Sequence, residues 1–219
     1  MPNVSDVANG YHLITAGLGS PNITYDRLAP VMDFVRANTN YLYHPDCSHF
    51  DVIGNESHVT YSGLTFGGWF NFDSFAATAS EGLISKWYET GNQRAYRIYR
   101  STNTGAISVQ VSGDGAAVDT TTIAGATYGI ANDNWYFIVG RFRPGKELKL
   151  WVNTTIASYT ATSIPAAATI YNSTEPFEIG RTNRANYFDG QAALCFVAAS
   201  IVPDYLIWSL WQHSRWLFK

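Results

Sequence analysis

Residues 134–153 read NWYFIVGRFRPGKELKLWVN, and the prediction of the fold starts from this stretch. Its first half is rich in aromatic and β-branched residues, which favour a β-strand. The Pro-Gly pair at 144–145 supplies a turn, because proline fixes one φ angle and glycine accepts a positive φ. Apolar and other side chains alternate in the second half, so they point to opposite faces. The stretch therefore predicts a β-hairpin with one face toward a core and with Lys149 and Trp151 facing outward.

Short apolar segments separated by turn residues extend this pattern over most of the chain. The further predicted strands are 64–72, 82–88, 94–100, 106–111, 176–181 and 191–199. Many short strands with a turn signal roughly every ten residues are typical of a β-sandwich or jelly roll. The last segment does not alternate, so we expect it to be covered on both faces.

The composition excludes several classes of protein. The chain has 219 residues, a net charge of -3 and a pI near 5.9, which argues against an electrostatic nucleic-acid binder. Only 14% of residues are charged, against about 25% in an average globular protein, so surfaces must be built from uncharged polar groups or be covered by other subunits. Residues 1–6 lack the features of a signal peptide, and no apolar run reaches the ~18 residues of a membrane span.

The two ends of the chain differ from the middle. Residues 1–40 are expected to form an N-terminal arm or lead-in, with a short helix at 29–37 because apolar residues recur there at helical spacing. Pro203 is expected to open a C-terminal helix that runs to about residue 212. This tail is too apolar for one helical stripe, so part of it should meet another subunit. The predicted interface consists of Leu206, Trp208, Trp211 and Trp216.

Six motifs, taken in order, resemble the laminin-G-like branch of the concanavalin A-like jelly rolls. They are LTFGGWF at 64–70, GLISKW at 82–87, NWYFIV at 134–139, LKLWVN at 148–153, FEIGR at 177–181 and FDGQ at 188–191. The resemblance covers roughly residues 41–219. It implies an all-β, two-sheet jelly-roll sandwich that has a short N-terminal arm and a C-terminal helix. It also implies binding rather than catalysis, often of glycans or protein surfaces and sometimes with calcium.

The chain departs from that family at two places. Asn153-Thr154 stands where the family has an Asp-Gly turn, and an apolar run at 192–196 stands where the family is commonly polar. The second departure favours burial against a partner. Glucanases on this fold need an E-x-D-x-x-E pattern to supply two catalytic carboxylates, and the sequence lacks it. Glu147 and Glu178 lie at predicted strand ends, where solvation is the ordinary explanation, so we predict that the chain is not an enzyme.

Two metal sites are considered. His44, Asp46, Cys47 and His49 could hold zinc, with His12 or His58 completing the site, although a polar loop is the stronger interpretation. Asp114, Asp133 and Asp189 could hold the calcium ion that the resemblance implies, although aspartate also stabilises turns. No other cofactor is expected. Cys47 and Cys195 could bridge, but two thiols do not make a disulfide framework.

A glycan site is predicted from Arg97, Tyr99, Lys149 and Trp151, whose side chains are expected to face outward. A pyranose face presents C–H groups to an aromatic ring, and polar neighbours can bind its hydroxyls. Contact with another subunit or with the N-terminal arm explains the same residues equally well, since Trp, Tyr and Arg are enriched at interfaces.

The first functional hypothesis is a structural or decoration protein of a virus particle, namely a phage capsid or tail. Its partners would be copies of itself, other virion proteins and host-surface glycans. The alternative is a secreted or cell-surface glycan-binding module, located outside the cell. A glycoside hydrolase is the least favoured hypothesis, and neither a nucleic-acid nor a membrane partner is expected.

Overall fold

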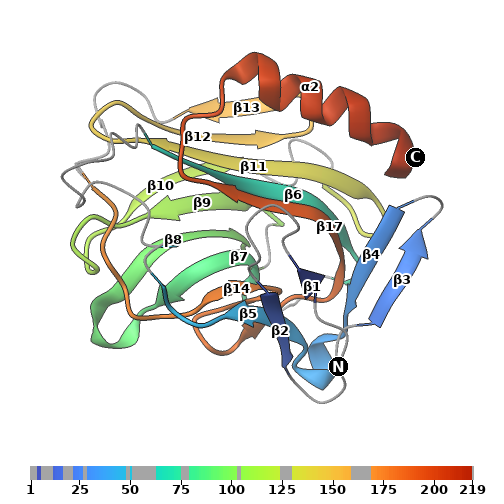
Figure 1. Cartoon of the computed structure of the whole chain (residues 1–219), viewed down its shortest axis with the longest axis horizontal. Helices are drawn as coiled ribbons and strands as arrows, with labels where there is room; N and C mark the ends of the chain where they lie inside the picture. The colour runs from blue at the N-terminus through green and yellow to red at the C-terminus, as the bar shows by residue number, and fades with distance from the viewer. Residues whose placement is uncertain are drawn as a thin grey trace.

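The computed structural model describes residues 4–5, 12–16, 22–26, 29–47, 50, 63–74, 79–102, 105–123, 130–158 and 169–218. Two large antiparallel sheets lie face to face, and a helix covers the outer face of one of them (Figure 1). The predicted all-β sandwich is therefore confirmed. Among the described helices, none is long and apolar enough to span a membrane.

The first sheet has eight strands in the order β1-β2-β5-β14-β7-β8-β9-β10. Their bounds are β1 Val4–Ser5, β2 His12–Ala16, β5 Tyr41–His44, β7 Glu81–Tyr88, β8 Gln93–Arg100, β9 Ile107–Val111, β10 Asp119–Ile123 and β14 Phe177–Ile179. Neighbours that are distant in sequence, such as β5 and β14, make this a sandwich of crossing connections rather than a simple meander.

The second sheet has seven strands in the order β13-β12-β11-β6-β17-β4-β3. Their bounds are β3 Asn22–Asp26, β4 Ala29–Phe34, β6 Leu64–Phe72, β11 Trp135–Arg143, β12 Glu147–Val152, β13 Thr155–Ser158 and β17 Gly190–Ala198. A two-stranded hairpin, β15 Arg181–Thr182 and β16 Asn186–Tyr187, lies against β7 of the other sheet.

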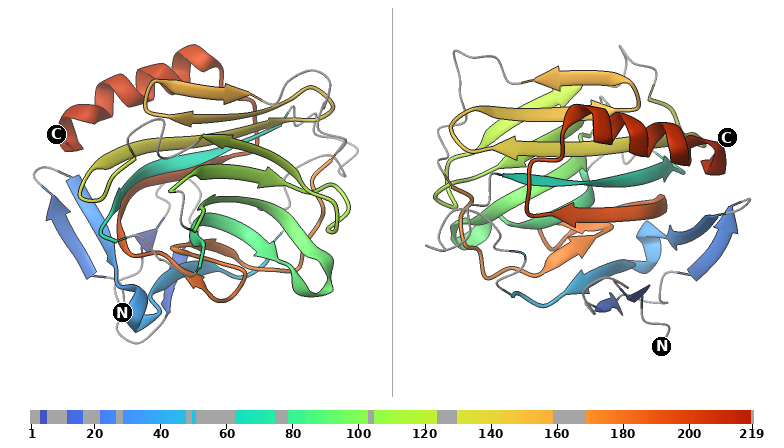
Figure 2. Two further views of the ribbon diagram at one scale, coloured as in Figure 1. Left: turned by 180° about the vertical axis from the view of Figure 1, so that it is seen from behind. Right: turned by 45° about the horizontal axis from the view of Figure 1, so that its top comes forward.

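Within the part of the chain that the structure describes, helical structure is confined to short segments. They are α2 Asp204–Ser214 and the 3₁₀ turns Arg36–Asn38, Thr90–Asn92 and Arg215–Phe218. Pro203 is the N-cap of α2 and has the extended conformation typical of that position, one residue before the first helical turn. The predicted C-terminal helix is confirmed. It lies across the outer face of the 7-stranded sheet (Figure 2).

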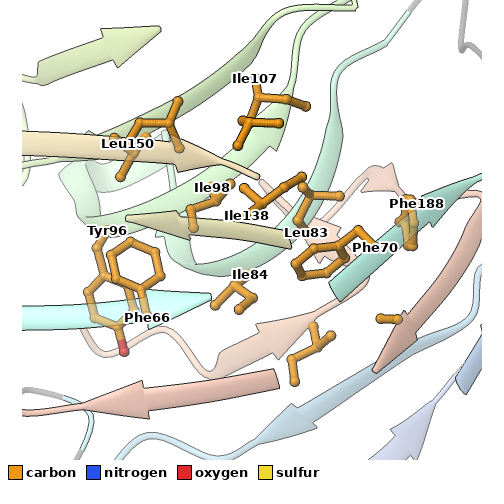
Figure 3. Packing of buried hydrophobic residues seen from close by; sticks show 14 of the residues in the cluster. Phe66, Phe70, Leu83, Ile84, Tyr96, Ile98, Ile107, Ile138, Leu150 and Phe188 are labelled. Carbon is orange, nitrogen blue, oxygen red and sulfur yellow. The ribbon is translucent and has the colours of Figure 1, made fainter. Parts of the chain in front are cut away.

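The main core lies between the two sheets and contains side chains from both. Figure 3 shows Phe66, Phe70 and Ile138 from the 7-stranded sheet beside Ile84 and Ile98 from the 8-stranded sheet. All five are fully buried. Gly140 belongs to this contact as well, since a Cβ at its position would approach Cγ2 of Val109 to 2.7 Å.

The hairpin predicted from residues 134–153 is confirmed as β11 and β12, which are paired from Ile138 and Val152 to Arg143 and Glu147 at the turn. Leu148 and Leu150 are buried in the main core. The outward Trp151 is also buried, because α2 lies over it.

The predicted helix at 29–37 is wrong. Residues 29–34 form β4, which pairs with β3 on one side and with β17 on the other, and only Arg36–Asn38 forms a 3₁₀ turn. The helical spacing was misleading because both faces of the strand are covered: Phe34 lies in the main core, whereas Val31 lies in the cluster under α2. The segment before residue 40 adds strands to both sheets. Its status as an arm separate from 41–219 stays a prediction.

The last strand, β17, agrees only in part with the prediction of burial on both faces. Ala192 is buried in the main core and Ala193 in the cluster under α2. The pairing with β6 then shifts between Ala193 and Phe196, where Leu194 has a φ of 49° and is 49% exposed. A bulge leaves the extra residue unpaired, which explains why the apolar run reaches solvent here.

Candidate functional site

The tail of the chain creates a second apolar cluster outside the sandwich. Trp69 on the outer face of the 7-stranded sheet contacts both Phe218 and Phe137, with ring centroids 4.8 Å apart for Trp69–Phe218 and 5.4 Å apart for Trp69–Phe137. The indole Nε1 of Trp69 donates to Ser214 Oγ at 2.9 Å. Ile207 is the buried residue of α2 in this cluster. These contacts fix the helix against the sheet.

The first turns of α2 and the β12–β13 turn enclose a cleft of about 250 Å³. It is lined by Trp151, Asn153, Thr154, Ile156, Asp204, Tyr205, Ile207 and Trp208, which we call the α2 cleft. Figure 1 shows the start of α2 beside β12 and β13. The volume is just below the roughly 300–1,000 Å³ of pockets for drug-sized ligands, so there is space for about one small ring.

Apolar side chains form most of the α2 cleft. Trp151 lies at its base and is 4% exposed, whereas Tyr205 is 70% exposed and Trp208 is 46% exposed. Trp208 is held by a stacked contact with Trp211, with ring centroids 4.9 Å apart. Two aromatic rings are thus displayed at the surface beside a buried third.

Polar groups are placed beside these rings. Asn153 adopts a left-handed conformation with φ 53°, and its Oδ1 accepts a hydrogen bond from the Phe137 amide at 2.9 Å. Its side chain is therefore held by the neighbouring strand. The Thr154 side chain is exposed, and Asp204 contributes a carboxylate that is 53% exposed. The lining thus combines hydrogen-bond donors and acceptors with aromatic faces.

A network of four charged residues supports the base of the α2 cleft. Arg141 lies 4.9 Å from the Trp151 ring and binds Glu147 and Asp204, at 2.8 Å to Glu147 Oε1 and 2.6 Å to Asp204 Oδ1. Lys149 Nζ lies 3.3 Å from Glu147 Oε2 and 3.4 Å from Asp204 Oδ2. The charges of the two cations and the two carboxylates cancel, so the network has no net charge.

The pKa of Asp204 reflects this network. Partial burial alone would raise it, but the hydrogen bond from Arg141 and the charges of Arg141 and Lys149 outweigh burial and lower the pKa. The carboxylate therefore stays ionised at neutral and mildly acidic pH.

The four residues predicted to bind a glycan do not share one face, so their grouping is wrong. Lys149 and Trp151 belong to β12 of the 7-stranded sheet, whereas Arg97 and Tyr99 belong to β8 of the 8-stranded sheet. Alternation placed both pairs outward but could not show that they lie on opposite sides. The expected exposure of Trp151 is also wrong, because α2 covers it.

Arg97 is enclosed rather than displayed. Its guanidinium lies 4.3 Å from the Trp87 ring and 4.4 Å from the Tyr99 ring, and its Nε donates to Gln110 Oε1 at 2.7 Å. Arg97 is 8% exposed. Whether it contacts a glycan stays a prediction.

The predicted interface residues lie on α2 and the turn that follows it. Leu206, Trp208 and Trp216 are 42%, 46% and 57% exposed, whereas Trp211 is half-buried against the second apolar cluster. Their role in subunit contact stays a prediction.

The three aspartates predicted to bind calcium divide into two places. Asp114 Oδ1 accepts hydrogen bonds from the amides of Ala116 and Ala117 at 2.8 and 2.7 Å, which is turn chemistry. Asp189 Oδ2 accepts from Ser74 Oγ at 2.6 Å, and the amide of Asp133 donates to the Phe72 carbonyl. Among the described residues, no group of three or more ligands suited to a metal ion is found.

The predicted zinc residues are partly engaged elsewhere. Asp46 Oδ1 accepts from Nζ of the buried Lys86 at 2.7 Å, and Cys47 Sγ lies 3.9 Å from Nδ1 of His44. His49 and His58 lie outside the described residues, as does the side chain of His12. Cys47 and Cys195 are both free thiols.

Sequence reasoning missed several residues of the α2 cleft. Asn153 and Thr154 were noted only because they replace an Asp-Gly turn, and residues 204–205 fell within the start of the expected C-terminal helix without being singled out. The useful signal was the polar pair at the end of a strand whose outward residue is a tryptophan.

Solved structures share the fold at low sequence identity. The receptor-binding domain of botulinum neurotoxin mosaic serotype C/D matches with a TM-score of 0.67 and 8% identity, over 94% of this chain and 47% of that chain. The botulinum neurotoxin DC binding domain in complex with rat synaptotagmin II matches with a TM-score of 0.65 and 8% identity, over 96% and 51%. A botulinum neurotoxin type C structure matches with a TM-score of 0.64 and 8% identity, over 97% and 50%.

This chain spans about half the length of these solved chains. No family model matches the sequence, and no curated protein matches it significantly. The comparisons support the fold, a two-sheet β-sandwich.

Proposed function

We propose that this chain is a carbohydrate-binding domain and that its ligand occupies the α2 cleft. The observation that carries the proposal is the cleft itself, in which the exposed rings of Tyr205 and Trp208 stand beside Asn153, Thr154 and Asp204. Small-molecule sites combine apolar and aromatic lining with a few placed polar groups, and this lining has both.

The chemistry of a sugar fits this combination. One face of a pyranose ring carries C–H groups, which pack on an aromatic ring, while its edge carries hydroxyls. The Asp204 carboxylate accepts hydrogen bonds from hydroxyls, and the Asn153 amide and the Thr154 hydroxyl both donate and accept. Because Asn153 and Asp204 are held by Phe137 and Arg141, ligand binding would immobilise few additional groups.

The structural neighbours support a recognition role. One reports that cell entry of botulinum neurotoxin type C depends on interaction with two ganglioside molecules, and another is a neurotoxin DC binding domain in complex with SialylT. Because identity is 8–9% and about half of those chains is covered, we transfer only the general role of surface recognition.

A glycan array with the full chain, followed by titration of the best binder, tests the proposal. Trp208→Ala should weaken binding at least tenfold, because it removes a ring that lines the α2 cleft. Trp216→Ala is the matched control, since Trp216 is 57% exposed and does not line the cleft. The proposal fails if no glycan binds, or if both variants bind as the parent does.

A second candidate function is favoured by the apolar exposure of α2. Leu206 and Leu210 are 42% and 46% exposed, in addition to the tryptophans. Exposed apolar side chains of this kind suit contact with another protein, which a structural protein of a virus particle would need. The protein would then be located in a virus particle or outside the cell. The native mass of the isolated protein tests it: a large particle or oligomer supports this role, whereas a monomer counts against it.

A further inference from the structure

The charged groups around the α2 cleft restrict the kind of sugar it can hold. Among the described residues that line the cleft, the one charged side chain is the carboxylate of Asp204. The nearest cations, Arg141 and Lys149, do not line it. The positions and the hydrogen-bond partners of these two cations decide whether either of them can bind an anionic ligand.

Arg141 is committed to groups of the protein. Its side chain is 5% exposed, its Nη1 binds both the Val202 carbonyl at 2.7 Å and Asp204 Oδ1 at 2.6 Å, and its Nε binds Glu147 at 2.8 Å. Its guanidinium also lies against the Trp151 ring. Bidentate recognition of a ligand carboxylate needs a free edge of the guanidinium, and these bonds occupy those edges.

Lys149 is similarly engaged. Its side chain is 22% exposed, and its Nζ lies between Glu147 and Asp204 at 3.3 and 3.4 Å. An anion that approached Lys149 from the α2 cleft would compete with Asp204 for the same ammonium. The two carboxylates already neutralise the two cations, so an added negative charge meets repulsion from Asp204 without a free cation to offset it.

We propose that the α2 cleft is selective for an uncharged hexose and excludes sugars that carry a carboxylate or a sulfate. This inference rests on the proposed carbohydrate-binding function and specifies its ligand class. The sugar ring stacks on Trp208 or Tyr205, and its hydroxyls donate to Asp204, which stays an acceptor because its partners keep it ionised. The volume of about 250 Å³ suits one ring of a longer neutral glycan.

The test compares pairs of sugars that differ only at C6, where a hydroxymethyl group in one is a carboxylate in the other. Methyl glycosides of glucose, galactose and mannose are titrated against the full chain by calorimetry, each beside the corresponding uronic acid. The neutral member of the pair that binds should bind at least tenfold more tightly. Because the discrimination is electrostatic, it should weaken when salt is raised from about 0.05 M to about 1 M.

A variant separates charge from shape. Asp204→Asn keeps the size of the side chain but removes the repelling charge, so the preference for the neutral sugar should fall at least threefold. Asp114→Asn is the matched control, because Asp114 caps a turn beside the 8-stranded sheet, away from the α2 cleft, and it should leave the preference unchanged.

The outcomes distinguish the two proposals. Equal or tighter binding of a uronic acid by the parent chain overturns the selectivity while leaving carbohydrate binding in place. A preference that survives unchanged in Asp204→Asn also overturns it. If no sugar of either kind binds, and the glycan array is also blank, the proposed function itself fails and the selectivity falls with it.

Discussion

The two sheets cover their outer faces by different means. The outer face of the 7-stranded sheet is apolar around Trp69 and Phe137, which lie under α2, and it also carries the ion-paired Arg141, Glu147 and Lys149 beside Trp151. The outer face of the 8-stranded sheet instead carries a row of polar residues on adjacent strands, including Glu178, Arg97 and Gln110. One sheet is thus covered mainly by hydrophobic packing, whereas the other carries a row of paired polar groups.

The polar row is nevertheless largely buried. Glu178 is 2% exposed, it forms an ion pair with Arg181, and the Arg181 guanidinium lies 3.6 Å from the Tyr41 ring. The comparison shows that burial alone does not reveal how a surface is stabilised. Truncation of a buried apolar side chain lowers stability in proportion to the volume removed. Removal of one partner of a buried ion pair lowers stability because it leaves the other charge buried and unpaired.

The largest expected effect is on the apolar face. Trp69→Ala removes the ring that contacts Phe137 and Phe218 and should lower the free energy of unfolding by about 4 kcal/mol. Urea unfolding followed by circular dichroism measures it. Trp216→Ala, at an exposed position, should change stability by less than about 0.5 kcal/mol. Equal losses in the two variants would contradict the role of Trp69 in holding α2.

The next effect is on the polar face. Glu178→Ala leaves Arg181 without its carboxylate and should cost about 3 kcal/mol, while Glu178→Gln should cost less because an amide oxygen still accepts. Glu89→Ala is the control, since the Glu89 side chain is 45% exposed and its pair with Arg97 should contribute about 0.5 kcal/mol. Similar losses for the two alanine variants would show that burial of the pair is unimportant.

A smaller effect compares one tryptophan from each face. Nε1 of Trp69 donates to Ser214, whereas Nε1 of the buried Trp87 has no hydrogen-bond partner among the described residues. Trp69→Phe should therefore destabilise more than Trp87→Phe, by about 1 kcal/mol, since only the first breaks a hydrogen bond. Thermal and urea unfolding of both variants measure the difference, and a larger loss for Trp87→Phe would reverse the interpretation.

The smallest expected effect is on pH dependence, where the two faces differ in sign. Burial raises the pKa of Glu178, and Arg181 offsets only part of that rise. The carboxyl of Glu178 thus favours the folded state most when protonated, and its contribution declines as pH rises from the ordinary glutamate value near ~4.3 through the raised pKa. The lowered pKa of Asp204 has the opposite consequence: its contribution is lost as pH falls below the ordinary aspartate value near ~3.9.

Unfolding free energies of the parent, Glu178→Gln and Asp204→Asn at several pH values test this. As pH falls toward the ordinary glutamate pKa of ~4.3, the free energy of unfolding of the parent should increase relative to that of Glu178→Gln. As pH falls below the ordinary aspartate pKa of ~3.9, the free energy of unfolding of the parent should decrease relative to that of Asp204→Asn. Each change should be under ~1 kcal/mol. Parallel trends in the two variants would contradict the difference in sign.

The sandwich could be predicted from the sequence because strands and turns are marked by residues within short stretches of the chain. The alternation in β12 and the Pro-Gly turn before it placed the hairpin correctly, and Pro203 marked the start of α2. The strand β4 was mistaken for a helix because its partners, β3 and β17, are recognised only once the sheet is assembled.

The candidate site was harder to predict because its parts are distant in sequence. The outward Trp151 was noted correctly, but the α2 residues that cover it come more than fifty positions later. Glu178 was expected to be solvated, since a carboxylate at a strand end usually is. Its burial depends on Arg181, whose position requires the turn at Gly180, with a φ of 85°.

The order in which the chain is synthesised matters for a sheet arranged in this way. β17 follows its neighbour β4 about 150 residues later in the chain, and the cover provided by α2 comes later still. Until then the apolar outer face around Trp69 stays open to solvent and to other chains. At a translation rate of about 5–20 residues per second, this exposure lasts for several seconds or more, which is the period in which association with other chains competes with folding.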